Sequence, residues 1–491
     1  MRDVALTLMS VLLLLTGTAM ADIIYVDCNG GGDYLTIQEG IDAAVEGWTV
    51  LVEPGTYTGP LNRNLDFGGT NIELRSTAGL SSTIIDCEGQ DRGFYFHNGE
   101  TSASVIDGFT VANAYDLQGA GIWCEYSSPT LINMKFLHNT AYDHGGGMWC
   151  GIGCESSLTN VTFYECAAWT GAGMYCFMSS PTLTNVAFKG NVAEWSGGGM
   201  RVLCGAPTLT NVSFLGNQAL GHDPPFGLVG GGAIHLTPAQ CEFPLTINQG
   251  EFENNSAAFD GGGLLVESGA TPPHLTSVQF SDNHAGRYGG AVVLSNSGPS
   301  MSDVQFYNNT AVLGGALVCQ AERVVDINGA YFSGNSADYG GAIYGDWQAS
   351  PSLQNVALAS NSAVFEGGGI YCHDGGFPSL NSVTFYRNTA EFGGGIACHG
   401  PLTAARNRAS GTLTIERSTG SPGETLVSAP RSSAEPDSAG AELDVARAPM
   451  SRDELDGITS AARVLADDAA TGDGGAQLER SRINYSGTYD S

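Results

Sequence analysis

The chain has 491 residues, with 69 glycines, only 14% charged residues and a formal net charge of −31. So acidic a chain argues against nucleic acids and anionic membrane surfaces as partners, because both are bound through basic patches. The composition is compatible with neutral glycans or cations as ligands.

Residues 1–21 predict a secretory signal peptide. Arg2 precedes an apolar run over residues 4–15, and Ala19-Met-Ala21 is typical of a cleavage site. The apolar run is too short for a transmembrane helix, and no other stretch is apolar enough for one. We therefore expect a secreted or cell-envelope protein with no membrane-spanning segment in the mature chain.

Residues 22–118 predict a cap followed by irregular first coils. The sequence Thr36-Ile-Gln-Glu39 predicts a capping box that opens a short helix reaching about Glu46. The expected apolar side of this helix consists of Ile37, Ile41, Ala44 and Val45. Because unpaired strand edges invite aggregation, we assign the helix to covering the open edge of the first coil.

Residues 119–400 repeat one pattern, in which a Phe-x-x-Asn element is followed by glycines and then an apolar residue. Successive copies lie 25 to 34 residues apart, half of them 26. The apolar residues that mark the copies are Ile122, Met148, Met174, Met200, Ile234, Leu264, Val292, Leu317, Ile343, Ile370 and Ile396. A fixed period of this size predicts a unit that buries its apolar face only by stacking on its neighbours.

Each repeat predicts three short strands. Apolar residues alternate over short runs such as Met174–Cys176, Pro181–Leu183 and Val186–Phe188, which are separated by Gly, Asn, Ser and Pro. This period of two favours strands over helices. One repeat therefore corresponds to one coil of a parallel β-helix, with neighbouring coils ~4.8 Å apart.

Two sets of residues resemble known families. Tyr25–Tyr34, Ile37-Gln38, Ala43-Ala44 and Val50–Tyr57 resemble the first segment of pectin-lyase-like right-handed β-helix proteins. The Phe-x-x-Asn and Gly-Gly-(Ala/Gly)-apolar elements resemble the repeats of bacterial polymorphic outer-membrane proteins. Together the resemblances cover residues 23 to about 399 and imply the fold, whereas this superfamily spans lyases, hydrolases and binding proteins.

The predicted fold class is therefore all-β, a single-stranded right-handed parallel β-helix solenoid with an N-terminal helical cap. Residues 401–491 contain no Phe, Trp or Cys and are rich in Ala, Ser, Asp and Gly. Such a segment cannot bury a core, so we expect a low-complexity, mostly disordered C-terminal tail.

The repeated asparagines and glycines have structural explanations. The Asn of Phe-x-x-Asn predicts a ladder of stacked amides, and a second ladder is predicted at Asn133, Asn160, Asn185, Asn211 and Asn355. The glycines predict tight turns with positive φ and close approach of stacked backbones. A phosphate-binding loop would need a helix after the glycines, and none is predicted.

Six of the twelve cysteines lie two residues after the apolar marker and should point inward: Cys124, Cys150, Cys176, Cys319, Cys372 and Cys398. In an exported protein, stacked cysteines lie near the distance for a disulfide, so two of Cys124, Cys150 and Cys176 can pair, as can Cys372 with Cys398. Cys28 with Cys87 and Cys154 with Cys166 are further candidates. The alternative is a ladder of free buried thiols. No cysteine spacing fits zinc, and we expect no metal site.

A column of acidic and aromatic residues lies between the Asn and the glycines of each repeat. Its members are Tyr142-Asp143-His144, Trp169, Glu194-Trp195, Phe259-Asp260, Arg287-Tyr288, Asp338-Tyr339, Phe365-Glu366 and Glu391-Phe392. Rings beside carboxylates suit a sugar-binding track. The alternative is that the aromatic residues close a corner of the solenoid while the acids keep it soluble. A longer loop between Asn217 and Gly231 is where we first expect a localised site.

The predicted function is that of a secreted or cell-surface scaffold that binds an extracellular glycan or a surface protein without catalysis. The expected locations are the cell exterior and the cell envelope, including the outer-membrane surface. The candidate binding residues are Trp195, Glu194, His222, Asp223, Phe259, Asp260, Tyr339, Glu366, Glu391 and Phe392. The alternative is a polysaccharide lyase or glycoside hydrolase, because stacked coils place carboxyls near the ~5 Å of a retaining hydrolase. No cofactor is expected, and calcium is the one ion left open.

Overall fold

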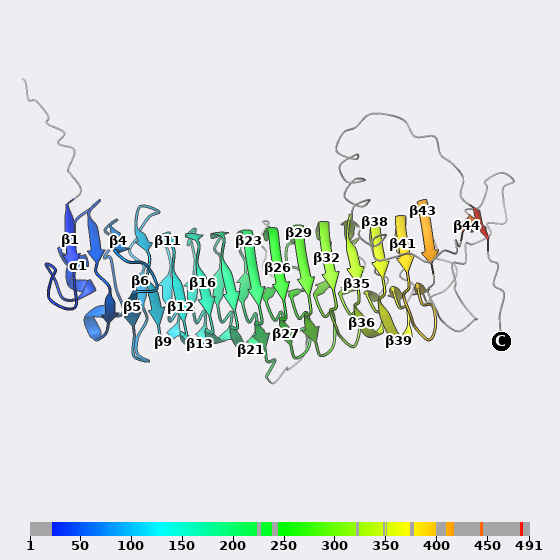
Figure 1. Ribbon diagram of the computed structural model, residues 1–491, viewed down its shortest axis with the longest axis horizontal. Coiled ribbons are helices and arrows are strands. Elements are labelled where there is room, and N and C mark those ends of the chain that lie inside the picture. Colours follow the sequence, from blue (N-terminus) through cyan, green and yellow to red (C-terminus); the bar gives the residue numbers. More distant parts are fainter. Residues whose placement is uncertain are drawn as a thin grey trace, which may run out of the picture.

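The computed structural model describes residues 22–222, 227–237, 244–320, 324–346, 349, 351–373 and 378–398, together with the backbone of 409–416, 442–444 and 482–484. The predicted signal peptide, Asp223 and most of the predicted tail lie outside these residues. The described chain is an elongated β-solenoid of about 14 turns whose strands stack along the long axis (Figure 1). The predicted all-β solenoid is confirmed.

The first and largest sheet has 22 strands. They are β1 (Ile23–Val26), β2 (Thr49–Val52), β3 (Gly55–Tyr57), β4 (Glu73–Ser76), β5 (Thr83–Asp86), β7 (Val105–Asp107), β8 (Thr110–Ala112), β11 (Thr130–Ile132), β12 (Lys135–Leu137), β15 (Ser157–Thr159), β16 (Thr162–Tyr164), β19 (Thr182–Thr184), β20 (Ala187–Lys189), β23 (Thr208–Leu215), β26 (Thr246–Glu253), β29 (His274–Ser281), β32 (Ser300–Tyr307), β34 (Asp326–Asn328), β35 (Tyr331–Ser333), β38 (Ser352–Ala359), β41 (Ser379–Tyr386) and β43 (Ala409–Glu416). In several later coils, one eight-residue strand such as β23 takes the place of two short ones.

The second sheet has 12 strands, which are β6 (Phe94–Phe96), β10 (Ile122–Cys124), β14 (Met148–Cys150), β18 (Met174–Phe177), β22 (Met200–Leu203), β25 (Ile234–Thr237), β28 (Leu264–Val266), β31 (Val292–Ser295), β33 (Leu317–Gln320), β37 (Ile343–Asp346), β40 (Ile370–Cys372) and β42 (Ile396–Cys398). The third sheet has seven strands, which are β9 (Tyr115–Gln118), β13 (Thr140–His144), β17 (Ala167–Thr170), β21 (Val192–Ser196), β24 (Gln218–Ala219), β27 (Ser256–Ala257) and β30 (His284–Ala285). Two strand pairs stand apart, β36 (Ser336–Tyr339) with β39 (Ser362–Glu366), and β44 (Glu442–Asp444) with β45 (Arg482–Asn484).

One coil passes through the three sheets in turn, as β17, β18, β19 and β20 do. Neighbouring coils pair in parallel and in register, so that Met148 lies beside Met174 and Phe163 beside Phe188. The strand β43 pairs with β41, which extends the first sheet beyond the predicted boundary at residue 400. The alternation of Ser-Gly-Thr-Leu-Thr-Ile in this strand explains the added pairing.

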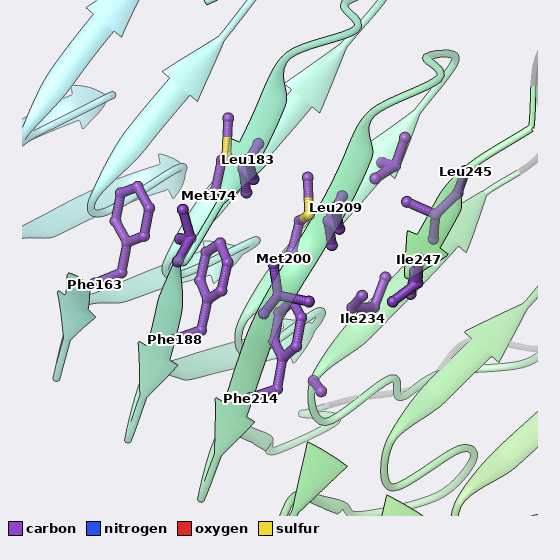
Figure 2. Close-up of a cluster of buried hydrophobic side chains, with 14 of the residues drawn as sticks. Phe163, Met174, Leu183, Phe188, Met200, Leu209, Phe214, Ile234, Leu245 and Ile247 are labelled. Atoms are coloured by element: carbon purple, nitrogen blue, oxygen red, sulfur yellow. The ribbon is translucent and has the colours of Figure 1, made fainter. Parts of the chain in front are cut away.

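The interior consists of rows of identical or similar side chains. The ring centroids of Phe188 and Phe214 lie 4.6 Å apart with an interplanar angle of 1°. Figure 2 shows these rings beside the rows that contain Met174 and Met200, and Leu183 and Leu209. All of these side chains are fully buried, so each coil contributes the same apolar layer to one continuous core.

The predicted ladder of Phe-x-x-Asn amides is confirmed. The side-chain amide of Asn217 donates to the Phe188 carbonyl at 2.9 Å and to Asn255 Oδ1 at 2.9 Å. The same oxygen of Asn255 accepts the backbone N–H of Asn217 at 3.0 Å. The pattern recurs through Asn283 and Asn309, and each buried amide thus satisfies turn backbone that water cannot reach. The second ladder lies at the surface, where Asn185 donates to Asn160 at 3.1 Å.

Steric space accounts for the repeated glycines. Gly197 has φ of +67°, a conformation that favours glycine. A Cβ atom on Gly198 would lie 2.4 Å from the Gln218 carbonyl oxygen of the next coil. The glycines therefore allow a sharp turn and close stacking, as predicted.

The predicted cap is present and is shorter than expected. The helix α1 (Ile37–Ala43) begins with the capping box, in which Thr36 Oγ1 donates to the Glu39 carboxylate at 2.6 Å. It ends before Val45, which is 53% exposed, so the prediction that Val45 packs inward is wrong. A Cβ atom on Gly40 would lie 2.5 Å from Val26 Cγ2, which places α1 directly on the first coil. A single 3₁₀ turn, η1 (Pro60–Asn62), supports it, since the Asn62 side chain accepts the Ile37 N–H at 2.8 Å.

The cysteines differ from the predicted pairings. Cys150 is bonded to Cys154, because the turn at Gly151–Gly153 brings Cys154 back over the end of β14. Cys124, Cys176 and Cys372 are buried thiols, and Cys398 is a partly buried one. Cys28, Cys87 and Cys166 are also thiols. The side chains of stacked cysteines project side by side and stay unbonded. The free thiols therefore fit the alternative prediction, a ladder of buried thiols. Burial raises the pKa of the Cys124 and Cys176 thiols to about 12, so they are not reactive.

Candidate functional site

A groove of about 520 Å³ lies on the outside of the third sheet. Its walls include Tyr115 from β9, Tyr142 and Asp143 from β13, Trp169 from β17 and Glu194 from β21. Tyr142 is 69% exposed and Trp169 is 42% exposed. Three aromatic rings on three successive coils therefore face solvent beside two carboxylates.

Strand alternation presents these rings. Thr140 of β13 pairs with Ala167 of β17, so Tyr142 follows the buried Ala141 just as Trp169 follows the buried Ala168. Successive side chains of a strand point to opposite faces, so Tyr142 and Trp169 both face solvent. The pairing shifts between Thr140 and His144, where β13 holds one residue more than β17.

The predicted residues Glu194 and His222 meet at one end of the groove. His222 Nδ1 lies 2.6 Å from the Glu194 carboxylate, and both side chains are about half exposed. The loop that follows Asn217 thus approaches the groove. Asp223 lies outside the described residues.

Trp195, the next residue after Glu194, faces the opposite way. Its ring lies 4.9 Å from the guanidinium carbon of Arg201, which also lies 5.9 Å from the Tyr175 ring. Alternate residues of a strand point to opposite sides, so Glu194 lines the groove while Trp195 packs toward the second sheet.

The outer face of the second sheet carries a row of residues that sequence analysis did not single out. We call it the outer row: the residues in register at the second position of each strand, namely Tyr95, Trp123, Trp149, Tyr175, Arg201, His235, Leu265, Val293, Val318, Tyr344, Tyr371 and Ala397. The Trp149 and Tyr175 rings stack 5.0 Å apart, and His144 stacks on Tyr175 at 4.6 Å. The recurrence of Trp, Tyr, Arg and His one residue after the apolar marker was a signal that could have revealed it.

Arg201 and His235 are unusual within this row. Arg201 forms no ion pair or hydrogen bond with the described residues, and burial lowers the pKa of its guanidinium. His235 is fully buried, with Nε2 2.8 Å from the Glu267 carboxylate. Burial, followed by the nearby Arg201 charge, lowers the pKa of His235, and the Glu267 hydrogen bond opposes this.

Four buried polar atoms in this region lack a partner among the described residues. They are Trp149 Nε1, Ser196 Oγ, Arg201 Nε and His235 Nδ1. A buried polar group without a hydrogen bond costs roughly 1–3 kcal/mol, so such a cluster points to bound water or to a ligand.

Asp260 does not belong to an exposed edge, contrary to the prediction. It is fully buried, and its carboxylate accepts hydrogen bonds from Arg287 Nε at 2.8 Å and from the Val229 N–H at 3.0 Å. Phe259 is half-buried beside the same guanidinium. The Asp260 carboxylate is thus bonded to Arg287 and to the backbone at the end of the loop that follows Asn217. It is therefore not available to bind a ligand.

The remaining predicted residues lie on later coils, away from the groove. Tyr339 packs against the apolar cluster of Leu265, Val293 and Val318, and its ring lies 5.2 Å from that of Phe365. Glu366 pairs in register with Phe392, which is 43% exposed, and Glu391 is exposed. Here the alternative interpretation fits, in which aromatic residues close a corner of the solenoid.

The described residues contain no group of three or more His, Cys, Asp or Glu side chains that could hold a metal ion. Across the same part of the chain, no helix has the length and apolar character needed to cross a membrane.

Comparison with known families agrees with this architecture. Residues 70–243 match the right handed beta helix region, and residues 329–346 match the Chlamydia polymorphic membrane protein repeat. The chain thus contains a right-handed β-helix region and one polymorphic membrane protein repeat. Both predicted resemblances are confirmed. No curated protein matches the β-helix protein.

Solved structures similar to this β-helix protein include several carbohydrate-active enzymes. One is the catalytic domain of a GH87 α-1,3-glucanase in complex with tetrasaccharides, with 12% identity, 76% of this chain and 64% of that chain covered, and a TM-score of 0.39. Another is a mannuronic acid specific family 6 lyase from human gut microbiota, with 12% identity, coverage of 89% and 96%, and a TM-score of 0.38. The β-helix protein thus spans less than two thirds of the glucanase domain. At these identities the likeness concerns the fold alone.

Proposed function

We propose that this chain is a secreted or surface-exposed β-helix that binds an extended extracellular glycan in the groove of the third sheet. The observation that carries the proposal is the row of exposed rings, Tyr115, Tyr142 and Trp169, on successive coils. Aromatic rings pack on the apolar faces of sugars, and each ring offers a large contact area at little entropic cost.

The two carboxylates of the groove complement these rings. Asp143 and Glu194 line the groove wall, where they can accept hydrogen bonds from sugar hydroxyl groups. With a net charge of −31, the chain is better suited to a largely neutral glycan than to a dense polyanion. Catalysis is not required by this arrangement, and a lyase or hydrolase remains the alternative that product analysis would reveal.

The test measures retention of the full chain on a panel of immobilised polysaccharides, with assays for new reducing or unsaturated ends. We expect retention on at least one neutral polysaccharide and no new ends. Trp169→Ala and Tyr142→Ala should each weaken binding about tenfold, since a stacked ring contributes on the order of 1 kcal/mol or more.

Two further variants make the result specific. Tyr25→Ala changes an exposed ring on β1, outside the groove, and should leave binding unchanged. Phe392→Ala tests whether binding extends along the later coils, and we expect no effect from it either. Unchanged binding in Trp169→Ala and Tyr142→Ala would contradict the proposal. If the parent chain releases new sugar ends and Glu194→Gln does not, the protein is an enzyme and not a non-catalytic scaffold.

A further inference from the structure

One outer face of the first sheet consists mainly of uncharged hydroxyl side chains. We call it the threonine face and define it as the first and third residues of β11, β15, β19, β23, β26, β29 and β32. Its centre holds Thr182, Thr184, Thr208, Thr210 and Thr246, and every other position is Thr, Ser, Asn, His or Ile. None of these positions is Asp, Glu, Lys or Arg, although the chain has a net charge of −31.

The threonine face is regular in two directions. Along one strand, its two side chains point to the same side and the residue between them, such as Leu209, is fully buried. Across the strands (Figure 1), neighbouring coils pair in parallel without a register shift, so Thr182 lies beside Thr208 and Thr184 beside Thr210. Side chains of the face therefore repeat at the coil spacing of ~4.8 Å and at ~6.7 Å along each strand.

The side chains of this face are held in place, but their hydroxyl groups are free. A proline directly precedes β11, β19, β23, β29 and β32 and fixes the backbone where each strand begins. Threonine is branched at Cβ, so its side chain has few rotamers. The hydroxyls of Thr182, Thr184, Thr208 and Thr210 form no hydrogen bond with the described residues, and these side chains are exposed or half-buried. The array is therefore ordered before any partner binds.

These properties exclude several kinds of partner. A small molecule needs a concave pocket, and the groove of about 430 Å³ beside the face begins at the bend, at Asn185 and Asn211, and includes no residue of the face. An ion or a charged polymer needs opposite charges, which the face lacks. Sugar rings pack on aromatic side chains, and no position of the face is Phe, Tyr or Trp. The face is complementary to an extended, uncharged surface whose hydrogen-bonding groups repeat.

We propose that the threonine face binds the surface of ice. Ice is uncharged, and its water molecules repeat along one lattice axis at nearly the spacing of the coils. The hydroxyls can hydrogen-bond water molecules at repeating positions, and the methyl groups between them confine the same layer of water. Each contact is weak, so binding depends on many contacts made at once by a rigid array. The face lies on a different sheet from the glycan groove, and the inference does not depend on glycan binding.

The test measures thermal hysteresis, which is the interval between the melting and freezing temperatures of a single ice crystal in a solution of the full chain. A second measurement follows the chain during slow freezing, because growing ice excludes most solutes. We expect a hysteresis that increases with protein concentration, and enrichment of the chain in the ice fraction.

Variants locate the activity on the threonine face. Thr182→Lys and Thr208→Lys each place a long charged side chain in the centre of the array, and should remove most of the hysteresis and of the enrichment in ice. Both positions are exposed, so the melting temperature followed by circular dichroism should not change. Ser213→Lys is the matched control, because Ser213 lies on the same strand as Thr208 but beyond the bend at Asn211, and it should behave like the parent chain.

Several outcomes would overturn the inference. They are a folded parent chain that shows neither hysteresis nor enrichment in ice, full activity in folded Thr182→Lys and Thr208→Lys, or an equal loss in Ser213→Lys. Retention on microcrystalline cellulose or chitin that depends on Thr208, without activity towards ice, would instead assign the face to a crystalline polysaccharide. Trp169→Ala separates the two proposals, since it should weaken polysaccharide retention and leave the activity towards ice unchanged.

Discussion

The outer row changes character along the solenoid. From Tyr95 to His235 its members are aromatic or charged, the next three, Leu265, Val293 and Val318, are aliphatic and fully buried, and Tyr344 and Tyr371 follow. The backbone positions are equivalent in both halves, since each residue pairs in register with the next. The interior rows of Phe and Asn continue through both halves, apart from Cys166 in the Asn row and Leu358 in the Phe row.

This difference separates the part of the sequence that builds the coils from the part that gives them chemistry. The inner face must present the same layer in every coil, because each coil is buried only by its neighbours. The outer row carries no such constraint and can accept a guanidinium in one coil and an isopropyl group in another. Function is therefore expected where the outer row departs from its aliphatic pattern.

The largest expected effect comes from exchanging the two kinds of outer-row residue. Val293→Arg places a guanidinium without a partner in a fully buried apolar cluster, and should lower the free energy of unfolding by on the order of 4 kcal/mol. Arg201→Met should change it by less than about 1 kcal/mol, because the half-buried guanidinium forms no ion pair or hydrogen bond with the described residues and interacts with Glu267 only at longer range. Denaturant unfolding of both variants measures the contrast. A large loss of unfolding free energy in Arg201→Met would show that Arg201 stabilises the fold, and would contradict the difference expected between the two kinds of outer-row residue.

The interior should respond equally in both halves. The Asn191 side chain donates to Phe163 at 3.1 Å and Asn335 donates to Phe306 at 3.0 Å, each as part of the same ladder. Asn191→Ala and Asn335→Ala should each cost about 3 kcal/mol, because they leave buried backbone groups unsatisfied. Thermal unfolding followed by circular dichroism measures both. Asn185→Gly, in the exposed ladder, is the control, with a loss below about 1 kcal/mol.

The polar half of the outer row should also make stability depend on pH. Burial holds the pKa of His235 below the value near 6.5 of an unfolded chain, despite the opposing Glu267. The unfolded state then binds more protons, so stability falls as pH drops from about 7 to 5, by at most about 1.4 kcal/mol per pH unit. Glu267, Arg201 and Asp260 are the charged groups that act on the same imidazole. His235→Gln should flatten the slope of urea midpoints against pH, and equal slopes would contradict the assignment.

The smallest effect is expected at the groove rim. His222 and Glu194 form an ion pair in which both side chains are about half exposed. Exposed pairs of this kind contribute about 0–1 kcal/mol, so His222→Ala should leave the unfolding midpoint nearly unchanged. Its effect on polysaccharide retention is the informative measurement, and a change in stability above about 1 kcal/mol would show that the loop helps to hold the coils together.

The fold could be predicted because its determinants are periodic. Phe188 and Asn191 recur at a fixed spacing, and the repetition itself implies that equivalent residues stack. The start of the capping helix could be predicted from Thr36 and Glu39, but the residue at which the helix ends could not. The Cys150–Cys154 bond could not be foreseen, since it depends on how sharply one turn closes.

The site was predicted only in part. Glu194 and Trp195 were identified from one column and His222 from the longer loop, but the members of the column do not share one environment. Tyr142 is exposed on the groove wall, whereas Asp260 is buried and paired with Arg287. Sequence analysis did not single out Tyr175 and Arg201, and the sequence carried no sign that His144 packs on Tyr175 and Trp195 on Arg201.

The helix α1 gives the solenoid a direction of growth. It blocks the first coil, and it leaves the ribosome before any of the regular repeats. Each later coil then finds only one free strand edge, that of the coil just completed, on which to form its hydrogen bonds. Chain elongation and folding can therefore proceed in the same direction, one coil at a time. A coil that pairs in the wrong register can then realign on the folded coil before it, before the next coil is synthesised.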